Sequence, residues 1–202
     1  MKASDYLKFY RAFVSLYGAI TSDEAYKIIK NYYPKTNKIE FLKDLKSRSR
    51  KRTVDYAVYQ FAGPNFLIVH DLMTFEQINK MLESHIDKPF YVPESVDDFL
   101  KYSDPGYIEE NDAFNILYDY LKKLYKDDKK AYLDATVIAY QIKVDMRIEA
   151  SVDLIQETYQ FKDEKDIEDF IKTYSIVNNN TKKQSNCGHS PNELRIIASA
   201  KK

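Results

Sequence analysis

The residues of this chain that point most directly to a chemistry are the basic side chains between positions 43 and 52. They stand close together in the string KDLKSRSRKR, where Asp44 is the single acid, although the whole chain has no net charge. Lys and Arg side chains neutralise phosphates and release counterions, so nucleic-acid binding through this run should weaken steeply with salt. The competing interpretation is a solvated helix end, where cations stabilise the helix dipole. The candidate nucleic-acid-binding residues are Lys43, Lys46, Arg48, Arg50, Lys51 and Arg52.

The densest acidic group is a second candidate for chemistry. Glu109, Glu110 and Asp112 carry the carboxylate oxygens that a hard cation prefers. They also precede an apolar helical stripe, and acidic side chains stabilise the positive end of a helix dipole, so we favour the helix-start interpretation. Asp134 and Asp145 have neither a histidine nor a second acid beside them. We interpret these two as solvated residues and not as a catalytic pair.

The histidines and the single cysteine give little support to metal or nucleophile chemistry. His70, His85 and His189 are scattered and show neither HxH nor HExxH spacing. Cys187 with His189 offers two soft ligands, whereas a closed zinc site needs about four. The sequence also has no GxSxG, GxGxxG or GxxxxGK[ST] pattern. We therefore expect no catalytic site, no metal, no cofactor and no enzymatic activity.

Charge is distributed unevenly along the chain and suggests two domains. Residues 1–72 carry 13 Lys and Arg against 7 Asp and Glu, whereas residues 73–202 carry 18 against 24. The first part is therefore basic (+6) and the second acidic (−6), and a basic part favours contact with a polyanion. We predict a domain over residues 1–72, a helical bundle over residues 73–180 and a polar tail over residues 181–202.

Three helices are predicted before the end of the basic run. Apolar residues at three-and-four spacing predict a helix over residues 5–17, which Gly18 ends. Thr21 and Glu24 have the spacing of a capping box at the start of the second helix. Asn37 is the predicted N-cap of the third helix, whose outer side is the basic run.

A β-hairpin is predicted after the third helix. Residues 54–61 and 66–69 are rich in β-branched and aromatic side chains, and Gly63–Asn65 forms a turn between them. Tyr56 and Tyr59 could stack on bases, although strand tyrosines are more often half-buried in a sheet. Three helices followed by a hairpin is the order of a winged helix, in which the third helix can enter the major groove.

The remainder of the chain is predicted to be helical. Thr74, Ser95 and Ser151 have the character of helix N-caps, and apolar stripes follow them. Asn178–Leu194 interrupts this pattern, and Ser190–Glu193 can start a helix again. The predicted fold class is therefore mainly α with one small β-hairpin: a winged-helix-like N-terminal domain followed by an all-α helical domain.

The cysteine content and the N-terminal sequence indicate a compartment. One cysteine excludes an internal disulfide framework and fits a reducing environment. The first residues, MKASDYLKFYRAF, have neither the apolar stretch of a signal peptide nor that of a membrane span. We expect a cytoplasmic protein without a membrane partner.

Four segments of the chain resemble an uncharacterised family of Firmicute proteins. They are Tyr6–Gly18 (YLKFYRAFVSLYG), Lys88–Pro93, Asn178–Thr181 and Gly188–Leu194. The resemblance implies a winged-helix-like N-terminal domain followed by a helical domain. Longer relatives carry a cysteine-rich SEC-C metal-binding module, whose cysteine pairs this chain lacks. The resemblance therefore transfers no zinc site and no established activity.

Two functions remain open from the sequence. The first is a nucleic-acid-binding accessory or regulatory protein that uses the third helix and the basic run on phosphates. The alternative is a protein-protein interaction module that binds a protein partner or a second copy, without nucleic-acid binding or catalysis. They differ in whether the basic side chains face solvent as one stripe or pair with acidic residues.

Overall fold

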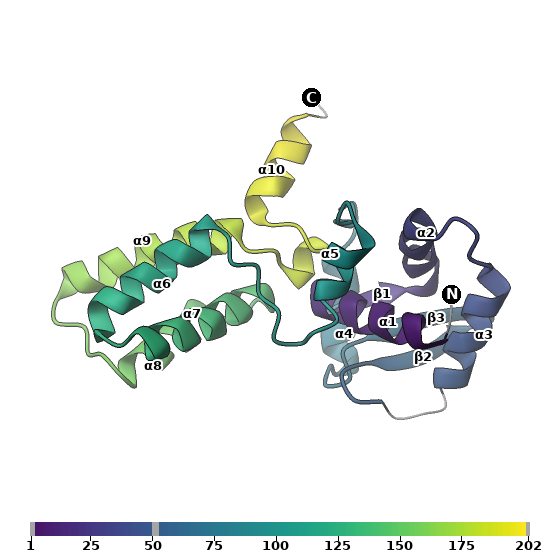
Figure 1. Cartoon of the computed structure of the whole chain (residues 1–202), viewed down its shortest axis with the longest axis horizontal. Coiled ribbons are helices and arrows are strands. Elements are labelled where there is room, and N and C mark those ends of the chain that lie inside the picture. The colour runs from purple at the N-terminus through teal and green to yellow at the C-terminus, as the bar shows by residue number, and fades with distance from the viewer. Residues whose placement is uncertain (1–2, 50–52, 201–202) are drawn as a thin grey trace. The chain divides into compact units, whose positions relative to one another are not determined.

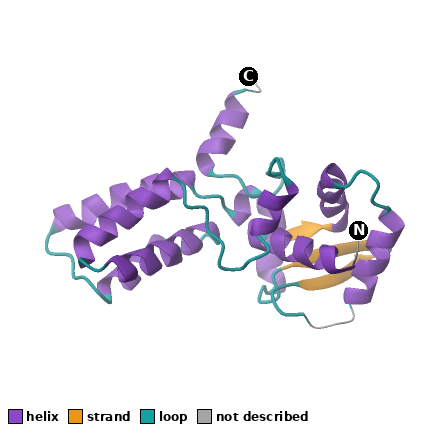
Figure 2. Ribbon diagram, viewed as in Figure 1, coloured by secondary structure: helices purple, strands orange, loops and turns teal. Residues whose placement is uncertain are grey.

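The computed structural model describes residues 3–49 and 53–200 of the 202-residue chain. It is mostly helical and contains a small antiparallel sheet of three strands, as the predicted fold class requires (Figure 2). The chain divides into two compact units, Met1–Tyr107 and Ile108–Lys202. Within the described residues, no helix is both long and apolar enough to span a membrane.

The first unit contains a helical layer, the sheet and two further helices (Figure 1). The strands follow the order β1-β3-β2, and both pairings are antiparallel. The elements are α1 (Ala3–Tyr17), β1 (Ala19–Thr21), α2 (Ser22–Tyr32), α3 (Lys38–Arg48), β2 (Ala57–Ala62), β3 (Asn65–Val69), α4 (Phe75–Ser84) and α5 (Val96–Lys101).

Side chains at the predicted positions start the helices of the first unit. The Thr21 hydroxyl accepts a hydrogen bond from the Glu24 amide, but the Glu24 carboxylate pairs with Lys27, so the predicted capping box is half formed. The Asn37 side chain accepts from two amides of α3, as predicted. Thr74 forms a complete capping box at α4.

Strand β1 is an element that the sequence reasoning missed. Its three residues follow Gly18, which adopts a φ of 70° that a residue with a side chain rarely takes. Ala19 pairs with Val69 and Thr21 with Leu67. The strand therefore forms only because it pairs with residues about fifty positions later in the chain. The described sheet therefore has one strand more than the predicted hairpin.

The two faces of the sheet are covered by different helices. Val58, Phe66 and Ile68 belong to the same buried cluster as the aromatic residues of α1. On the other face, Leu67 and Val69 pack with Ile78 of α4. Alternate residues of β3 thus point to opposite faces, as strand geometry requires.

The segment after residue 72 belongs to the first unit in the structure. Phe99 of α5 is fully buried, with its ring centroid 5.3 Å from that of Phe9 and 5.4 Å from that of Phe13. The Tyr17 hydroxyl donates a 2.6 Å hydrogen bond to the Tyr91 carbonyl. The change from basic to acidic sequence at residue 72 therefore lies inside this unit, between β3 and α4.

The second unit is a helical bundle. α6 packs against α7 and α9, and the shared core contains Leu117, Leu121, Ile138, Ile142 and Phe170. The elements are α6 (Asp112–Tyr125), α7 (Asp128–Lys143), α8 (Ile148–Gln156), α9 (Glu164–Asn180), the 3-10 helix η1 (Gln184–Asn186) and α10 (Pro191–Ser199).

One predicted N-cap of the second unit is wrong. Ser151 lies inside α8, where its buried hydroxyl donates a 2.7 Å hydrogen bond to Gln141 Oε1. Arg147 occupies the N-cap position instead and makes no side-chain cap hydrogen bond. The N-cap prediction failed because the Ser151 hydroxyl bonds to a residue of α7 and not to a backbone amide of its own helix.

We expect Phe99→Ala to lower the free energy of unfolding of the first unit by about 3–5 kcal/mol, because it opens a cavity in the aromatic core. Native-state hydrogen exchange of the α1 amides measures this loss in the full chain. Phe61→Ala is the matched control, since Phe61 is 62% exposed; it should change the same quantity by no more than about 0.5 kcal/mol. Equal effects of the two substitutions would contradict the placement of α5.

Candidate functional site

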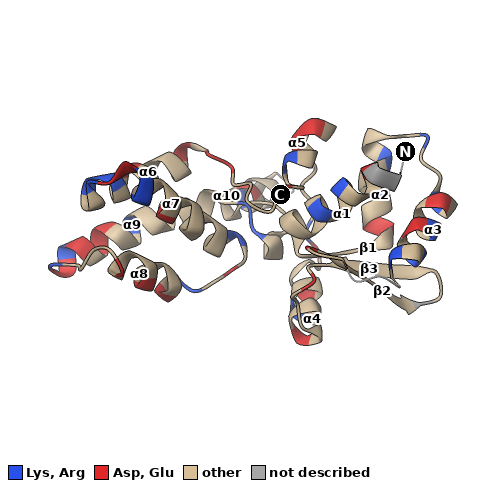
Figure 3. Cartoon of the chain, turned by 60° about the horizontal axis from the view of Figure 1, so that its bottom comes forward, with Lys and Arg blue, Asp and Glu red and all other residues tan. Residues whose placement is uncertain are grey.

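The structure divides the predicted basic run into three parts. Lys43 and Lys46 are exposed on α3, whereas the side chain of Arg48 is only 17% exposed. Figure 3 shows the positions of Lys and Arg on the ribbon of α3 beside those of Asp and Glu. Arg50, Lys51 and Arg52 lie outside the described residues. The candidate site on α3 therefore rests on its two exposed lysines.

Arg48 belongs to a polar network beneath α3. Its Nε atom donates to Asp44 Oδ2 at 2.6 Å, and Nη1 donates to the Tyr56 hydroxyl at 3.0 Å. The guanidinium also lies 5.3 Å from the ring centroid of Tyr10. The prediction that Arg48 contacts phosphate is not supported by this geometry, since its donors are engaged by Asp44 of α3 and by Tyr56 in the segment before β2.

Asp44 joins the network to α1. Its Oδ2 accepts a 2.8 Å hydrogen bond from the Tyr10 hydroxyl in addition to the one from Arg48. Burial and the neighbouring Asp44 carboxylate raise the pKa of Tyr10 far above its usual value, so this hydroxyl stays protonated. Burial alone would lower the pKa of Arg48, but hydrogen bonding to Asp44 outweighs it and raises that pKa. The guanidinium therefore remains charged.

The outer face of α3 has a different character. Ile39, Lys43 and Lys46 are exposed and recur at three-and-four spacing, so they form one stripe along the helix. In the part of the chain that the structure describes, no carboxylate forms an ion pair with Lys43 or Lys46. Lys38, one turn earlier, is paired with Asp23 at 2.8 Å. The stripe can therefore present two uncompensated cations to a partner.

The two hairpin tyrosines have different environments. Tyr56 is fully buried, where it meets Arg48, and so cannot stack on a base. Tyr59 is 39% exposed, and its ring centroid lies 5.8 Å from that of Phe75, which is 75% exposed. Phe61 on the same strand is also exposed. Tyr59 and Phe75 therefore form an exposed aromatic pair, and Phe61 is a further exposed ring on β2.

The predicted polar tail is an ordered part of the second unit. Cys187, His189 and Ser190 are buried, and η1 and α10 lie on either side of them. Ser190 and Glu193 form the complete capping box of α10, and the helix restart predicted here is confirmed. The polar composition suggested a tail without packing, whereas this segment is ordered by buried polar contacts and not by an apolar core.

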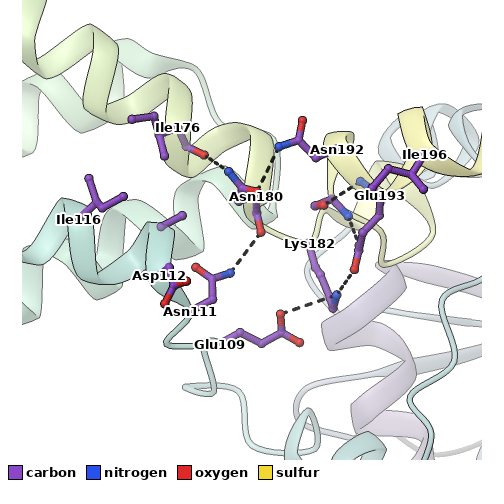
Figure 4. Close-up of a pocket in the computed structure, with 12 residues that line it drawn as sticks. Glu109, Asn111, Asp112, Ile116, Ile176, Asn180, Lys182, Asn192, Glu193 and Ile196 are labelled. Atoms are coloured by element: carbon purple, nitrogen blue, oxygen red, sulfur yellow. Dashed lines mark hydrogen bonds and ion pairs between the residues drawn. The ribbon is translucent and has the colours of Figure 1, made fainter.

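Ion pairs attach this segment to the bundle. Lys182 Nζ lies 2.8 Å from Glu193 Oε1 and 3.8 Å from Glu109 Oε2, and its side chain is only 11% exposed. Lys183 pairs with Asp145 at 3.3 Å. Figure 4 shows Lys182 between the carboxylates of Glu109 and Glu193. The partners are 11 to 73 positions apart in the sequence, so spacing alone could not have revealed them.

A pocket of about 420 Å³ adjoins this ion-pair cluster (Figure 4). Its polar end contains Lys182, both carboxylates and the amide groups of three asparagines, which bond to one another and to the Asn180 backbone. Its apolar walls come from α6, α9 and α10. The lining residues are Glu109, Asn111, Asp112, Ala113, Ile116, Ile176, Asn180, Lys182, Ser190, Asn192, Glu193 and Ile196.

The charges of this cluster are set by burial and by their partners. Burial of Glu193 would raise its pKa, but hydrogen bonds from His189, Lys182 and the Ser190 amide lower it to about 2. Burial lowers the pKa of Lys143 to about 8, although the charge of Glu109 opposes this shift. At neutral pH the cluster thus keeps an ionised carboxylate in a half-buried position.

The acidic candidates from the sequence are engaged in structural contacts. Asp112 lies in the first turn of α6, as the helix-start interpretation predicts, while Asn111 provides the cap. Glu110 accepts a 2.5 Å hydrogen bond from the Tyr132 hydroxyl. Asp134 is 1% exposed and pairs with Lys130 at 2.9 Å, so its interpretation as a solvated residue is wrong. Within residues 3–49 and 53–200, no three His, Cys, Asp or Glu side chains are grouped as metal ligands.

Comparison of the chain with family models, curated proteins and solved structures finds no match. Any inference about function therefore rests on the side chains and their geometry.

We expect Asp44→Ala to lower the free energy of unfolding of the first unit by about 3 kcal/mol, because it removes the carboxylate from a partly buried charged network. Asp23→Ala is the control: its ion pair with Lys38 is about half exposed, and such pairs contribute about 0–1 kcal/mol. Urea denaturation followed by circular dichroism compares the two variants. A negligible effect of Asp44→Ala would show that the network does not hold α3.

The stability contributed by Glu193 should depend on pH. The pKa of its carboxyl group falls from an ordinary 4.5 to about 2 on folding, so its contribution is complete above about pH 4.5 and is lost as the pH falls towards 2. Thermal unfolding of wild type and Glu193→Gln should differ at pH 7 and converge near pH 2. Glu168→Gln, at an exposed position of α9, is the control and should follow wild type throughout. A Glu193→Gln difference of the same size at both pH values would contradict the pKa assignment.

Proposed function

We propose that the first unit is a winged-helix module that binds nucleic acid through the outer face of α3. Its elements follow the order α1-β1-α2-α3-β2-β3, with the strands arranged β1-β3-β2. In a helix-turn-helix arrangement the second of two consecutive helices is the one that enters the major groove. α3 holds that position after α2, which supports the proposal.

The exposed stripe of α3 is the observation that carries the proposal. Lys43 and Lys46 present two ammonium groups that form no ion pair within the described residues, and such groups neutralise phosphates. Ile39, one turn before Lys43, is 65% exposed near the start of the helix, where recognition helices contact base edges and thymine methyl groups. Arg48 has a supporting role, since it ties the buried side of α3 to Asp44.

A protein partner is the second candidate, and a separate observation favours it. The Tyr59–Phe75 pair and the ring of Phe61 are exposed and uncharged, and aromatic residues are enriched at protein interfaces. A partner of this kind would bind through these rings and not through the lysines of α3. The cytoplasmic location and the family resemblance remain predictions from the sequence.

We expect the double substitution Lys43→Ala with Lys46→Ala to weaken binding of the full chain to a labelled DNA or RNA duplex. Loss of two phosphate contacts should reduce the slope of log affinity against log salt by about 1.8, at about 0.9 per contact for duplex DNA. Fluorescence anisotropy across a salt series measures both quantities. The double variant should fold as wild type does, because both side chains are exposed.

The matched control removes two lysines from the second unit. Lys122→Ala with Lys123→Ala makes the same change in net charge on the exposed side of α6. It should leave the salt slope close to that of wild type. Absence of wild-type binding at low salt, or equal losses in the two double variants, would overturn nucleic-acid binding through α3 and leave the protein partner.

A further inference from the structure

Two further side chains of α3 share its exposed face with the lysines. Ile39 precedes Lys43 by four positions and Glu40 precedes it by three, and all three side chains are exposed. Residues three and four positions apart in a helix lie on the same side. Ile39 and Glu40 therefore extend the stripe of Lys43 and Lys46 towards the start of the helix.

Neither of these side chains belongs to the core of the first unit. Ile39 is 65% exposed, although the same helix buries Phe41 completely. Among the described residues, the carboxylate of Glu40 forms no ion pair. The helix is already capped by Asn37, which accepts from the Glu40 amide. An acid in the first turn also favours the helix dipole, and this structural role is the competing interpretation of Glu40.

The chemistry of the two side chains matches base edges in the major groove of DNA. Cytosine presents an N4 amino group there, from which a carboxylate accepts a hydrogen bond. Guanine and thymine turn acceptor atoms towards the groove, and adenine has an acceptor beside its amino group, so these bases suit a carboxylate less well. The methyl group of thymine is the apolar contact that a side chain such as isoleucine can make. Glu40 thus favours cytosine, and Ile39 favours thymine.

The same two contacts distinguish DNA from RNA. The major groove of A-form RNA is deep and narrow, so side chains cannot read the bases there. RNA also contains uracil, which lacks the methyl group of thymine. An exposed helix face that combines isoleucine with a carboxylate is therefore suited to the wide major groove of B-form DNA.

We propose that α3 reads duplex DNA directly: Glu40 accepts a hydrogen bond from the N4 amino group of a cytosine, and Ile39 contacts the methyl group of a thymine. Lys43 and Lys46 hold adjacent phosphates, which position the helix but carry no sequence information. This inference rests on the proposed function of α3 and adds to it a substrate class and two specificity-determining residues. Glu40 also acts against other bases, because an acceptor that faces it leaves both groups without a hydrogen bond.

Selection of bound sequences from a random-sequence duplex DNA library by the full chain tests the role of Glu40. Wild type should select a site with a preferred cytosine and a preferred thymine. Glu40→Gln should change the preference at the cytosine position to adenine, because glutamine pairs with N6 and N7 of adenine. A purely structural role of Glu40 would leave the preference unchanged, since glutamine also suits this helix position. Glu83→Gln, at an exposed position of α4, is the matched control and should select the wild-type site.

Uracil substitution in the selected duplex tests the contact of Ile39. Replacement of the preferred thymine by uracil removes only the C5 methyl group. It should weaken binding of wild type about fourfold, the factor that corresponds to burial of one CH₂-sized group. The same replacement should have no effect on binding by Ile39→Ala. Ile86→Ala, at a position of the first unit that is also 65% exposed, should respond as wild type does.

The possible outcomes separate this inference from the proposed function. Binding of duplex DNA without a base preference, or with one that Glu40→Gln and Ile39→Ala leave unchanged, would overturn direct readout but leave phosphate binding by the lysines of α3. An RNA duplex bound as tightly as the selected DNA would overturn the substrate class. Absence of binding to any duplex at low salt would overturn both the proposed function and this inference.

Discussion

The carboxylate of Asp44 is the contact on which the geometry of the candidate interface depends. It accepts hydrogen bonds from Tyr10 of α1 and from Arg48, which in turn donates to Tyr56. These bonds hold one side of α3 against the rest of the first unit. The opposite side, with Lys43 and Lys46, is thereby kept towards solvent. The described part of the basic run therefore contributes Arg48, which attaches α3 to the rest of the unit, and the two exposed lysines that we propose bind nucleic acid.

The second unit uses charge in a different way. Lys182 and Lys183 are largely buried, and each is neutralised by carboxylates from other segments. These ion pairs order a segment that is rich in polar residues, and they place Ser190 where it caps α10. Because these lysines and carboxylates already pair with one another, we interpret the cluster as structural: it positions α10 and the pocket beside it.

Local features of the fold could be predicted from the sequence, and long-range features could not. Asn37 and Thr74 were recognisable because a cap is a contact between residues two or three positions apart. β1 was missed because its strand conformation depends on pairing with β3. The role of Arg48 was missed for a similar reason, since spacing does not show that its side chain reaches Tyr56. Net charge also failed to locate the end of the first unit, where Phe99 completes the core.

We propose that the outer face of α3 contacts nucleic acid. An NMR titration of the ¹⁵N-labelled full chain with a DNA duplex tests it most directly, because each backbone amide reports on its own surroundings. If α3 binds the duplex, shift changes should occur along α3 around Lys43 and Lys46, and the amides of α6 should be unaffected. Shift changes confined to the second unit, or none at low salt, would contradict it.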